Sequence, residues 1–212
     1  YMIYFIITTC LLKSKNANER KDKYKESLKI LKNLLDNKKN IKIIIVENTG
    51  KKHRTFLNDY GFDVFYTDNN HKCNTHNKGV KELKDVCDCI EKYNIKDEDL
   101  VIKMTGRYIL NENSEFISEI INYKNQDCIL RYGSFFKPVN ERVTDCITGL
   151  IGMKAKHIKN IDMKAGYKKK EYPMEWEWAR VTLNIDLNKI KIMNKLGISI
   201  SPSSAKNKYF EV

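Results

Sequence analysis

Apolar residues along the chain follow two alternating patterns. Consecutive apolar residues, many of them β-branched, form short runs that end in turn-forming residues, as expected of buried strands. These runs cover residues 2–8, 41–46, 62–67 and 100–104. Between them, apolar residues recur three and four positions apart over residues 19–36 and 77–93, which predicts amphipathic helices. The alternation indicates an α/β protein whose mostly parallel sheet is covered by helices.

The pattern changes in the second half of the chain. Residues 128–132 and 147–153 have the apolar pattern of strands, but no long helix separates them. We therefore expect the sheet to become mixed there. The remaining expected elements are a short helix at 56–60 that ends at Gly61, a helix at 114–123 capped by Ser114, a helix at 174–183 preceded by Pro173, and strands at 190–193 and 198–200.

Length and composition indicate one domain that spans residues 1–212. The sequence has only 3 prolines and 9 glycines, and no Ser/Gly-rich stretch resembles a linker. Hydrophobic residues make up 42% and charged residues 31% of the chain, which is ordinary for a soluble globular protein. A chain of this size buries roughly 70% of the surface that it exposes when unfolded.

The net charge of +12 raises the question of nucleic-acid binding. The lysines are spread along the whole chain among Asn, Asp and Glu residues, and the one local run, 168–170, is short. We therefore expect no nucleic-acid partner. The surplus positive charge would still attract an anionic substrate such as a nucleotide diphosphate.

Several classes of protein are excluded by motifs that the sequence lacks. The 6 cysteines form no C-x-x-C pair or zinc pattern, so reduced thiols in the cytoplasm are expected. The apolar segment 2–12 is too short to span a bilayer, and no basic stretch precedes it. No G-x-S-x-G, G-x-x-x-x-G-K or H-E-x-x-H motif is present, which argues against esterases, P-loop kinases and zinc proteases.

Candidate binding residues follow from the expected sheet, because ligands of open α/β sheets bind beyond the carboxyl ends of the strands. The polar residues at these ends are Thr8, Thr9, Glu47, Asn48, Asp68, Thr105, Gly106 and Arg107. We add Asn77, Lys78 and Gly79, since the first N–H groups of a helix favour a phosphate. The Asp-x-Asp of residues 97–99 precedes a strand, so we assign it to a solvated loop at the opposite edge.

A resemblance to a known family rests on this order of elements and on three segments. After the fourth strand stands Lys103-Met104-Thr105-Gly106-Arg107-Tyr108, and residues 77–80 and 148–178 add to the match. The chain resembles the GT-A class of nucleotide-sugar glycosyltransferases, in particular those of bacterial surface-polysaccharide clusters and large DNA viruses. The resemblance implies a Rossmann-like GT-A fold, with a nucleotide-binding part at about 1–110 and an acceptor-binding part at about 111–212.

The resemblance also implies an activity. The chain would move a hexosyl or deoxyhexosyl group from a nucleotide-sugar, such as a UDP-sugar, to a glycan hydroxyl. It would act in polysaccharide or glycoprotein glycan synthesis, in the cytoplasm of a bacterium or of a virus-infected host. Thr8 and Thr9 would contact the nucleoside, and Glu47 or Asn48 the base or ribose. Lys103 and Arg107 would flank the diphosphate, and Asn77, Lys78 and Gly79 would line the nucleotide pocket.

The chain departs from the family at the usual metal-binding position. Thr105-Gly106-Arg107 stands where these transferases carry an Asp-x-Asp. A Mn²⁺ or Mg²⁺ ion could be held by Asp68 and the phosphates, or the guanidinium of Arg107 could supply the positive charge itself. We expect weak or no metal dependence.

The late acidic segment 173–180 is the candidate catalytic and acceptor site. A carboxylate at a helix start beside an aromatic wall suits a general base, and we choose Glu175, with Glu177 second. Trp176 or Trp178 would stack on a sugar, and Arg180 would orient the carboxylate. The alternative is structural, since the helix dipole favours first-turn glutamates and one Trp of such a pair points into the core.

Residues around the predicted strand 147–153 could also serve the acceptor. Thr148 and Gly149 would let an acceptor approach closely, or they belong to a simple edge strand.

Two other functions remain open from the sequence. A non-catalytic module that binds a nucleotide-sugar or glycan would need the same pocket. A sugar nucleotidylyltransferase would need a glycine-rich basic loop after the first strand, which residues 8–12 lack.

Overall fold

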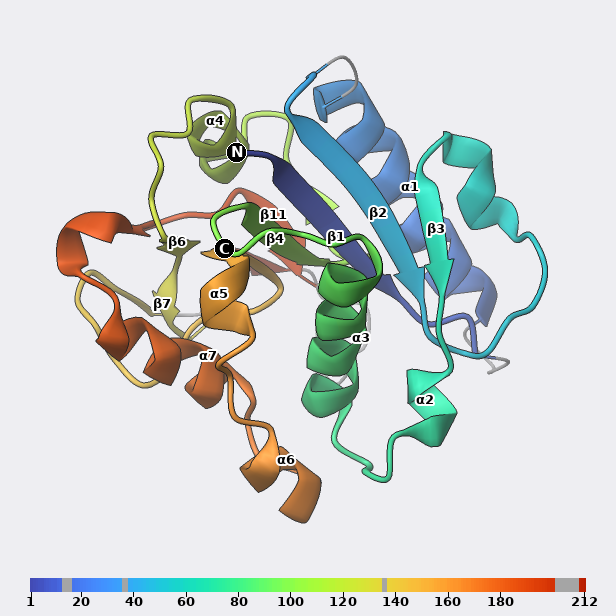
Figure 1. Cartoon of the computed structure of the whole chain (residues 1–212). Coiled ribbons are helices and arrows are strands. Elements are labelled where there is room, and N and C mark those ends of the chain that lie inside the picture. The colour runs from blue at the N-terminus through green and yellow to red at the C-terminus, as the bar shows by residue number, and fades with distance from the viewer. Residues whose placement is uncertain (13–16, 36–37, 135–136, 201–209) are drawn as a thin grey trace.

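A seven-stranded sheet forms the centre of the protein (Figure 1). The computed structural model describes residues 1–12, 17–35, 38–134, 137–200 and 210–212. The strand order is β10-β6-β9-β4-β1-β2-β3. β1 (Ile3–Thr9) pairs in parallel with both β2 (Ile41–Glu47) and β4 (Leu100–Thr105), and β2 pairs in parallel with β3 (Asp63–Tyr66). The parallel half predicted from the apolar runs is confirmed.

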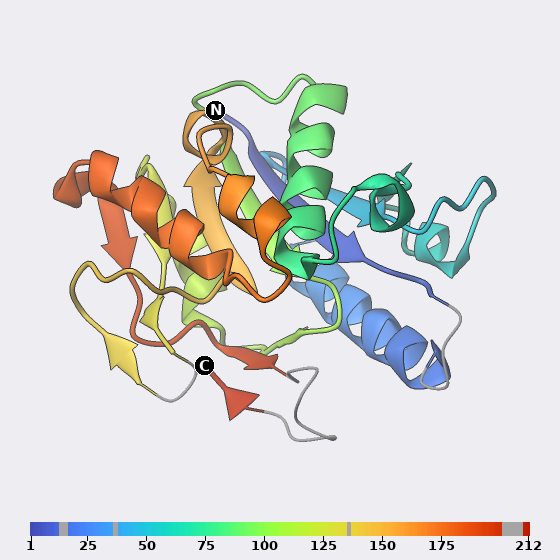
Figure 2. The same ribbon diagram turned by 90° about the horizontal axis from the view of Figure 1, so that it is seen from below.

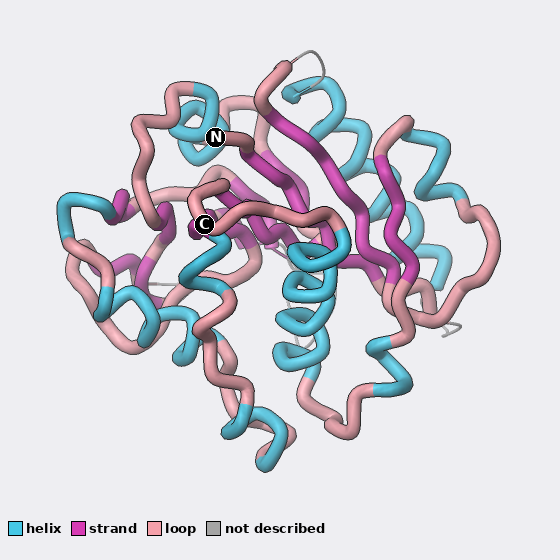
Figure 3. Tube along the Cα trace, in the orientation of Figure 1, coloured by secondary structure: helices cyan, strands magenta, loops and turns pink. Residues whose placement is uncertain are grey.

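The other half of the sheet is mixed, as the sequence predicts. β9 (Leu150–Lys154) is antiparallel to both β4 and β6 (Cys128–Leu130), and β10 (Ile190–Ile192) is parallel to β6. Short strands build two small additional sheets: β5 (Ile109–Leu110) with β11 (Ile198–Ile200) and β12 (Phe210–Glu211), and β7 (Tyr132–Gly133) with β8 (Pro138–Val139). Figure 3 shows the strands between the helices that cover them.

Helices cover both faces of the sheet (Figure 2). α1 (Ala17–Leu35) and α4 (Glu115–Ile121) pack on one face, and α3 (Lys78–Lys92), α5 (Ala155–Ile158) and α7 (Glu175–Val181) pack on the other. The shorter helical segments are α2 (Asn69–Lys72), α6 (Lys164–Lys168), η1 (Phe56–Tyr60), η2 (Thr182–Asn184) and η3 (Leu187–Lys189).

The central strand explains why its apolar run is continuous. Ile3, Phe5 and Ile7 of β1 point toward α1, whereas Ile6 points toward α3, and all four are fully buried. Successive side chains of a strand alternate between its two faces, so a strand covered on both faces is apolar throughout. Each such side chain contributes about 1.5–3 kcal/mol when buried.

Local signals at the helix ends are confirmed, and two boundaries differ. The Ser114 hydroxyl accepts a hydrogen bond from the N–H of Ile117 at 3.3 Å, and Gly61 ends η1 with a φ of 79°. The loop predicted at residues 68–74 contains the single turn of α2. The strand predicted from residue 147 begins at Leu150, and residues 147–149 before it line a cavity described below.

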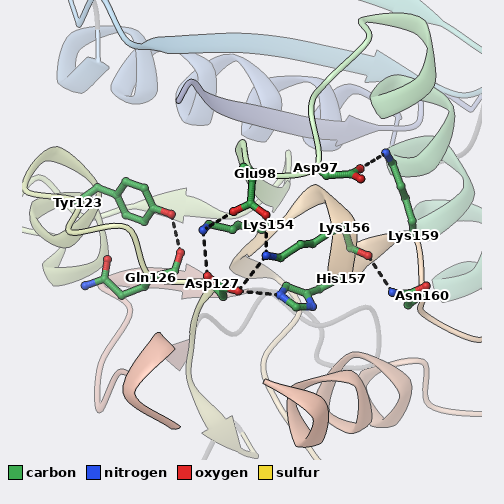
Figure 4. Close-up of polar contacts among 10 residues, drawn as sticks. All are labelled: Asp97, Glu98, Tyr123, Gln126, Asp127, Lys154, Lys156, His157, Lys159 and Asn160. Atoms are coloured by element: carbon green, nitrogen blue, oxygen red, sulfur yellow. Dashed lines mark hydrogen bonds and ion pairs between the residues drawn. The ribbon is translucent and has the colours of Figure 1, made fainter. Parts of the chain in front are cut away.

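Acidic residues before β4 lie at the amino edge of the sheet, as predicted (Figure 4). Asp97 pairs with Lys159 at 2.5 Å, and Glu98 pairs with Lys154 at 2.8 Å. Asp99 differs from the solvated residue that we expected. It is buried and accepts hydrogen bonds from the N–H of Met2 at 2.8 Å and of Lys96 at 3.1 Å. This carboxylate therefore fixes the start of β1 beside the start of β4.

Asp127 is the centre of the ion pairs at this edge (Figure 4). Its carboxylate lies 3.0 Å from the Nζ of Lys154, which is only 3% exposed, and 3.0 Å from the Nε2 of His157. Burial raises the pKa of Asp127, but the hydrogen bonds from His157 and Lys154 outweigh burial and lower that pKa to about 2. The carboxylate joins the start of β6 to the junction of β9 and α5.

We expect Asp127→Asn to lower the free energy of unfolding at pH 7 by about 1–3 kcal/mol, because Lys154 loses a buried partner. A carboxyl group with a lowered pKa stabilises the fold above its unfolded pKa, near 3.9, and loses this contribution as the pH falls toward about 2. Urea unfolding at pH 7, 4 and 3 should therefore show that the difference in unfolding free energy between the wild type and Asp127→Asn shrinks below pH 4.

Glu98→Gln is the matched control, because the Glu98 side chain is 64% exposed. This substitution should lower the free energy of unfolding at pH 7 by less than about 1 kcal/mol. A loss for Asp127→Asn that is the same at pH 7 and pH 3 would contradict the assignment.

Candidate functional site

The strand register brings the predicted polar residues together at one edge of the sheet. Thr8 lies opposite Val46 of β2 and opposite Thr105 of β4, and Thr9 lies opposite Glu47. The chain adds β2 and β3 on one side of β1 and then returns to place β4 on the other side. This reversal of strand order is where open α/β sheets bind their ligands.

A cavity of about 490 Å³ opens at this edge. Many of its lining residues were candidates from the sequence: Thr8, Thr9, Asn48, Lys78, Gly79, Thr105, Arg107, Thr148, Gly149 and Glu175. Asn70, which follows the third predicted strand, also lines the cavity. Others were not anticipated, among them Arg20, Tyr24, Lys81, Glu82, Tyr108, Ser134 and Asp145. The cavity therefore joins residues of the proposed nucleotide part to residues of the proposed acceptor part.

Cationic side chains of the cavity are positioned for an anion. Arg20, Lys78, Lys81 and Arg107 all line it, and Lys78 also begins α3. Burial lowers the pKa of Arg107, but Tyr108 and Glu82 outweigh burial and raise it, so the guanidinium stays charged. The Nε of Arg107 is buried and has no hydrogen-bond partner among the described residues. Arg107 lines the cavity, and a guanidinium in such a position can donate to a phosphate oxygen.

Glu82 links the ends of β1 and β4 beneath the cavity. Its carboxylate accepts hydrogen bonds from the Thr8 hydroxyl at 2.5 Å and the Thr105 hydroxyl at 2.9 Å. It also lies 2.8 Å from the Nζ of Lys103, which is 2% exposed and donates to the carbonyl of Thr148 at 2.6 Å. Burial raises the pKa of Glu82, but Lys103 and the two hydroxyls lower it by more. Lys103 thus has an internal counter-ion.

Asp85 forms a second buried cluster one helical turn further along α3. The carboxylate is 0% exposed and accepts from the amide of Asn48 at 2.7 Å, the Thr67 hydroxyl at 2.9 Å and the Asn69 amide at 2.8 Å. Burial raises the pKa of Asp85 to about 6, although these three donors oppose the shift. Asp85 therefore fixes the residues that follow β2 and β3.

The sequence contained a signal for Glu82 that we did not use. On a helix, residues four apart lie on the same face, so Glu82 lies below Lys78, which we had already placed at the binding edge. Asp85 follows three residues later on that face. We had assigned only the apolar residues of this helix to its buried side.

Glu175 reaches the cavity because α7 begins against the start of α3. A Cβ atom at Gly79 would lie 2.8 Å from the Cβ of Met174, so glycine allows this close approach. The side-chain amide of Asn77 donates to the carbonyls of Tyr172 at 2.8 Å and Lys169 at 3.2 Å. The start of α3 therefore positions the only acidic residue of α7 that lines the cavity in the described part of the chain.

Several donor-side candidates are not among the residues that line the cavity. They are Glu47, Asp68, Asn77, Lys103 and Gly106. Glu47 is fully buried and accepts from the N–H of Leu11 at 2.9 Å and the Thr49 hydroxyl at 2.7 Å. Asp68 faces His71 at 2.7 Å. A Cβ at Gly106 would lie 3.0 Å from the carbonyl of Thr8, so this glycine allows the loop after β4 to pack on β1.

The other candidates of the late acidic segment also lie outside the cavity lining. Glu177 is buried and pairs with the Tyr172 hydroxyl and with Arg180, the latter at 3.2 Å. Trp178 belongs to the core beside α3, whereas Trp176 is 43% exposed and packs edge-on against Tyr172. Their proposed contacts with an acceptor stay predictions.

The described residues lack two kinds of feature. Across the described ranges, no group of three or more His, Cys, Asp or Glu side chains could hold a metal ion. No described helix has both the length and the apolar character needed to cross a bilayer.

The comparisons with known proteins agree with this architecture. No protein-family model matches the sequence, and no curated protein matches it. Among solved structures, TarS of S. aureus superposes with a TM-score of 0.56 at 10% identity over 99% of this chain and 36% of TarS. A second TarS structure, of residues 1–349, gives a TM-score of 0.54 at 11% identity over 93% of this chain and 60% of that one.

A further match comes from Desulfovibrio desulfuricans G20. This proposed nucleotide-diphospho-sugar transferase superposes with a TM-score of 0.52 at 9% identity, over 90% of this chain and 79% of its own. The present chain thus spans about a third of the full TarS structure and most of the Desulfovibrio protein. At these identities the matches show the fold alone, and that fold is the GT-A-like fold that the resemblance predicted.

We expect Lys103→Met to destabilise the protein by about 3 kcal/mol, because it leaves the Glu82 carboxylate without its buried partner. Adding Glu82→Gln should restore part of the loss, since the uncompensated charge is then gone. Urea unfolding of the wild type, both single variants and the double variant at pH 7 measures this coupling. Additive losses would contradict it.

Proposed function

We propose that the chain is a glycosyltransferase that takes a sugar from a nucleoside-diphosphate donor and transfers it to a hydroxyl of a glycan or sugar. One observation carries the proposal: a single cavity at the reversal of strand order joins Arg107, Lys78 and the start of α3 to the carboxylate-bearing Glu175. The fold that the chain shares with a proposed nucleotide-diphospho-sugar transferase supports the same function.

The donor would lie across the ends of β1, β2 and β4. Thr8, Thr9 and Asn48 would meet the nucleoside, and the first N–H groups of α3 with Lys78 would meet the diphosphate. The planar guanidinium of Arg107 matches two phosphate oxygens at once. These cations would offset the negative charge that develops on the leaving diphosphate in the transition state. Electrostatic stabilisation of such developing charge is usually the largest contribution to catalysis.

Metal dependence is part of the proposal. Arg107 belongs to the segment that replaces the Asp-x-Asp of the family that the chain resembles. Its fixed positive charge would therefore stabilise the diphosphate, as a divalent cation otherwise does. We propose weak dependence on Mn²⁺ or Mg²⁺. A chelator titration during turnover tests this directly.

Glu175 would act as the general base. It would take the proton of the acceptor hydroxyl while that oxygen bonds to the anomeric carbon and the bond to the diphosphate breaks. Glu177 is less suited, because it is already bonded to Tyr172 and Arg180. Asp145 is another carboxyl group that lines the cavity, and burial raises its pKa.

In this proposal, the two halves of the chain bind the two substrates separately. Residues 1–110 would hold the nucleotide, and residues 111–212 would hold the acceptor through Thr148, Gly149 and the start of α7.

We expect Glu175→Gln to lower kcat by about 10²–10⁴-fold, because it removes the base but keeps the shape of the side chain. Nucleotide affinity should change by less than about twofold, since Glu175 does not contact the nucleotide in this proposal. Arg107→Ala should instead weaken nucleoside-diphosphate binding by roughly 10–100-fold, the effect of losing charged hydrogen bonds. Released nucleotide measures turnover, and calorimetry measures binding.

Glu171→Gln is the control, since Glu171 is exposed and lies outside the cavity. Asp145→Asn distinguishes the role of Asp145 from that of Glu175. Full activity of both the Glu175 and Arg107 variants would reject the site. Binding without any turnover in the wild type would identify a nucleotide-sugar-binding module instead.

A further inference from the structure

Exposed apolar side chains are concentrated in one segment, residues 164–189, which runs from α6 through α7 to η3 and is called the α6–η3 segment below. Seven large hydrophobic side chains are exposed among the described residues, and four of them belong to this segment. They are Tyr167, Trp176, Leu183 and Leu187. An exposed apolar residue on its own is ordinary, whereas a group of them marks a surface that contacts a partner.

The exposed side of α7 is opposite to the side that the core uses. α7 continues directly into η2, so Trp176 and Leu183, seven residues apart, fall on the same side of this helical stretch. Trp178 and Ala179 lie on the other side and pack in the core beside α3. Figures 1 and 2 show α6 and α7 in succession along the border of the molecule. The protein therefore has no described element that covers the exposed side.

The same segment carries lysines whose charge the protein does not compensate. Five of them are exposed and have no ion-pair partner in the part of the chain that the structure describes: Lys164, Lys168, Lys169, Lys170 and Lys189. The exposed carboxylates of the segment are Glu171 and Asp186. By contrast, the lysines in Figure 4 pair with Asp97, Glu98 and Asp127. A shallow hollow of about 400 Å³ lies in the loop between α6 and α7, and Lys169 and Lys170 line it.

These two kinds of side chain together fit the surface of an anionic bilayer. Lysines attract anionic headgroups, and Trp and Tyr side chains prefer the boundary between headgroups and acyl chains. Leucines add apolar area that enters this boundary. A second copy of the chain would instead bring another net charge of +12 against these lysines. A nucleic acid would supply negative charge but no apolar phase for Leu183 and Leu187.

We propose that the α6–η3 segment docks the protein on a membrane surface that contains anionic lipids. The segment lies on the bilayer and does not cross it, since its helices are only 3–7 residues long. Trp176 directly follows Glu175, which lines the cavity, so the docked surface borders the candidate site. The inference does not depend on the proposed function.

Vesicle sedimentation at pH 7.5 tests the proposal. The wild type should bind vesicles in which about a third of the lipid is phosphatidylglycerol at least about tenfold more strongly than vesicles of phosphatidylcholine alone, and salt should weaken this binding. Replacing Lys168, Lys169 and Lys170 by Gln should lower the partition coefficient by at least about tenfold, because each lysine near an anionic surface contributes about fivefold. Leu183→Ser with Leu187→Ser should lower it by at least about tenfold through lost apolar area.

The matched control replaces Lys29, Lys38 and Lys39 by Gln. These three lysines are exposed, and they lie on α1 and in the turn after it, away from the α6–η3 segment. The control changes the net charge by the same amount, so its partition coefficient should stay within about twofold to threefold of the wild type if the segment binds the membrane. Ile121→Ser, on α4, is the corresponding control for the leucines.

Tryptophan fluorescence reports insertion separately from electrostatic adhesion. The sequence has 2 tryptophans, and Trp178 is buried in the core whereas Trp176 is exposed. On anionic vesicles the emission should shift to the blue, and lipids with brominated acyl chains should quench it, because Trp176 enters the boundary region. Trp176→Phe should abolish both changes.

Several results would overturn the inference. These are no binding to anionic vesicles, an equal loss in the control and in the Lys168–Lys170 variant, or sedimentation without any change in Trp176 emission. Tight binding of single-stranded DNA that the same lysine variant abolishes, with no vesicle binding, would assign the surface to nucleic acid instead. A wild type that binds vesicles but neither UDP nor GDP would reject the proposed function alone, and one that binds UDP or GDP but no vesicles would reject this inference alone.

Discussion

Because β1 pairs in parallel with β2 on one side and with β4 on the other, the three strands end at the same edge of the sheet. Their last polar residues meet there without any long loop. The register is fixed by burial on both faces, since a shift by one residue would move Ile6 to the opposite face and exchange the two sides of the core. The site thus follows from the packing of apolar residues that never touch it.

The charges near this edge are not equivalent. Lys103 is buried and paired with Glu82, so its charge is compensated inside the protein. The cations that line the cavity, Arg107 and Lys78 among them, remain available to an anion. A buried cation attracts a diphosphate strongly only when no internal carboxylate already neutralises it. This is why we assign the diphosphate to Arg107 and give Lys103 a supporting role.

The sequence predicted the parts of the molecule that depend on local pattern. Apolar runs located the parallel strands, and the rule for carboxyl ends located Thr8, Asn48 and Arg107 at the cavity. It did not predict Glu82 or Asp85, because a carboxylate on a helix is expected to face water unless the partner that buries it is known. It ranked Glu175 before Glu177, but it did not supply the structural reason. Glu175 lines the cavity because Gly79 and Met174, residues 95 positions apart, approach closely.

Two carboxylates close to the proposed diphosphate position would normally weaken binding there by repulsion. Here each is directed at the protein itself: Glu82 at Lys103 and two hydroxyls, and Asp85 at three neutral donors. Hydrogen bonds to a carboxylate disperse its charge, and Lys103 cancels the charge of Glu82 outright. Helix α3 can therefore present its positive end to the ligand while its second and third turns hold the strand ends in place. In the proposed function, the start of the helix attracts the anion, and its buried carboxylates order the ends of β1, β2, β3 and β4.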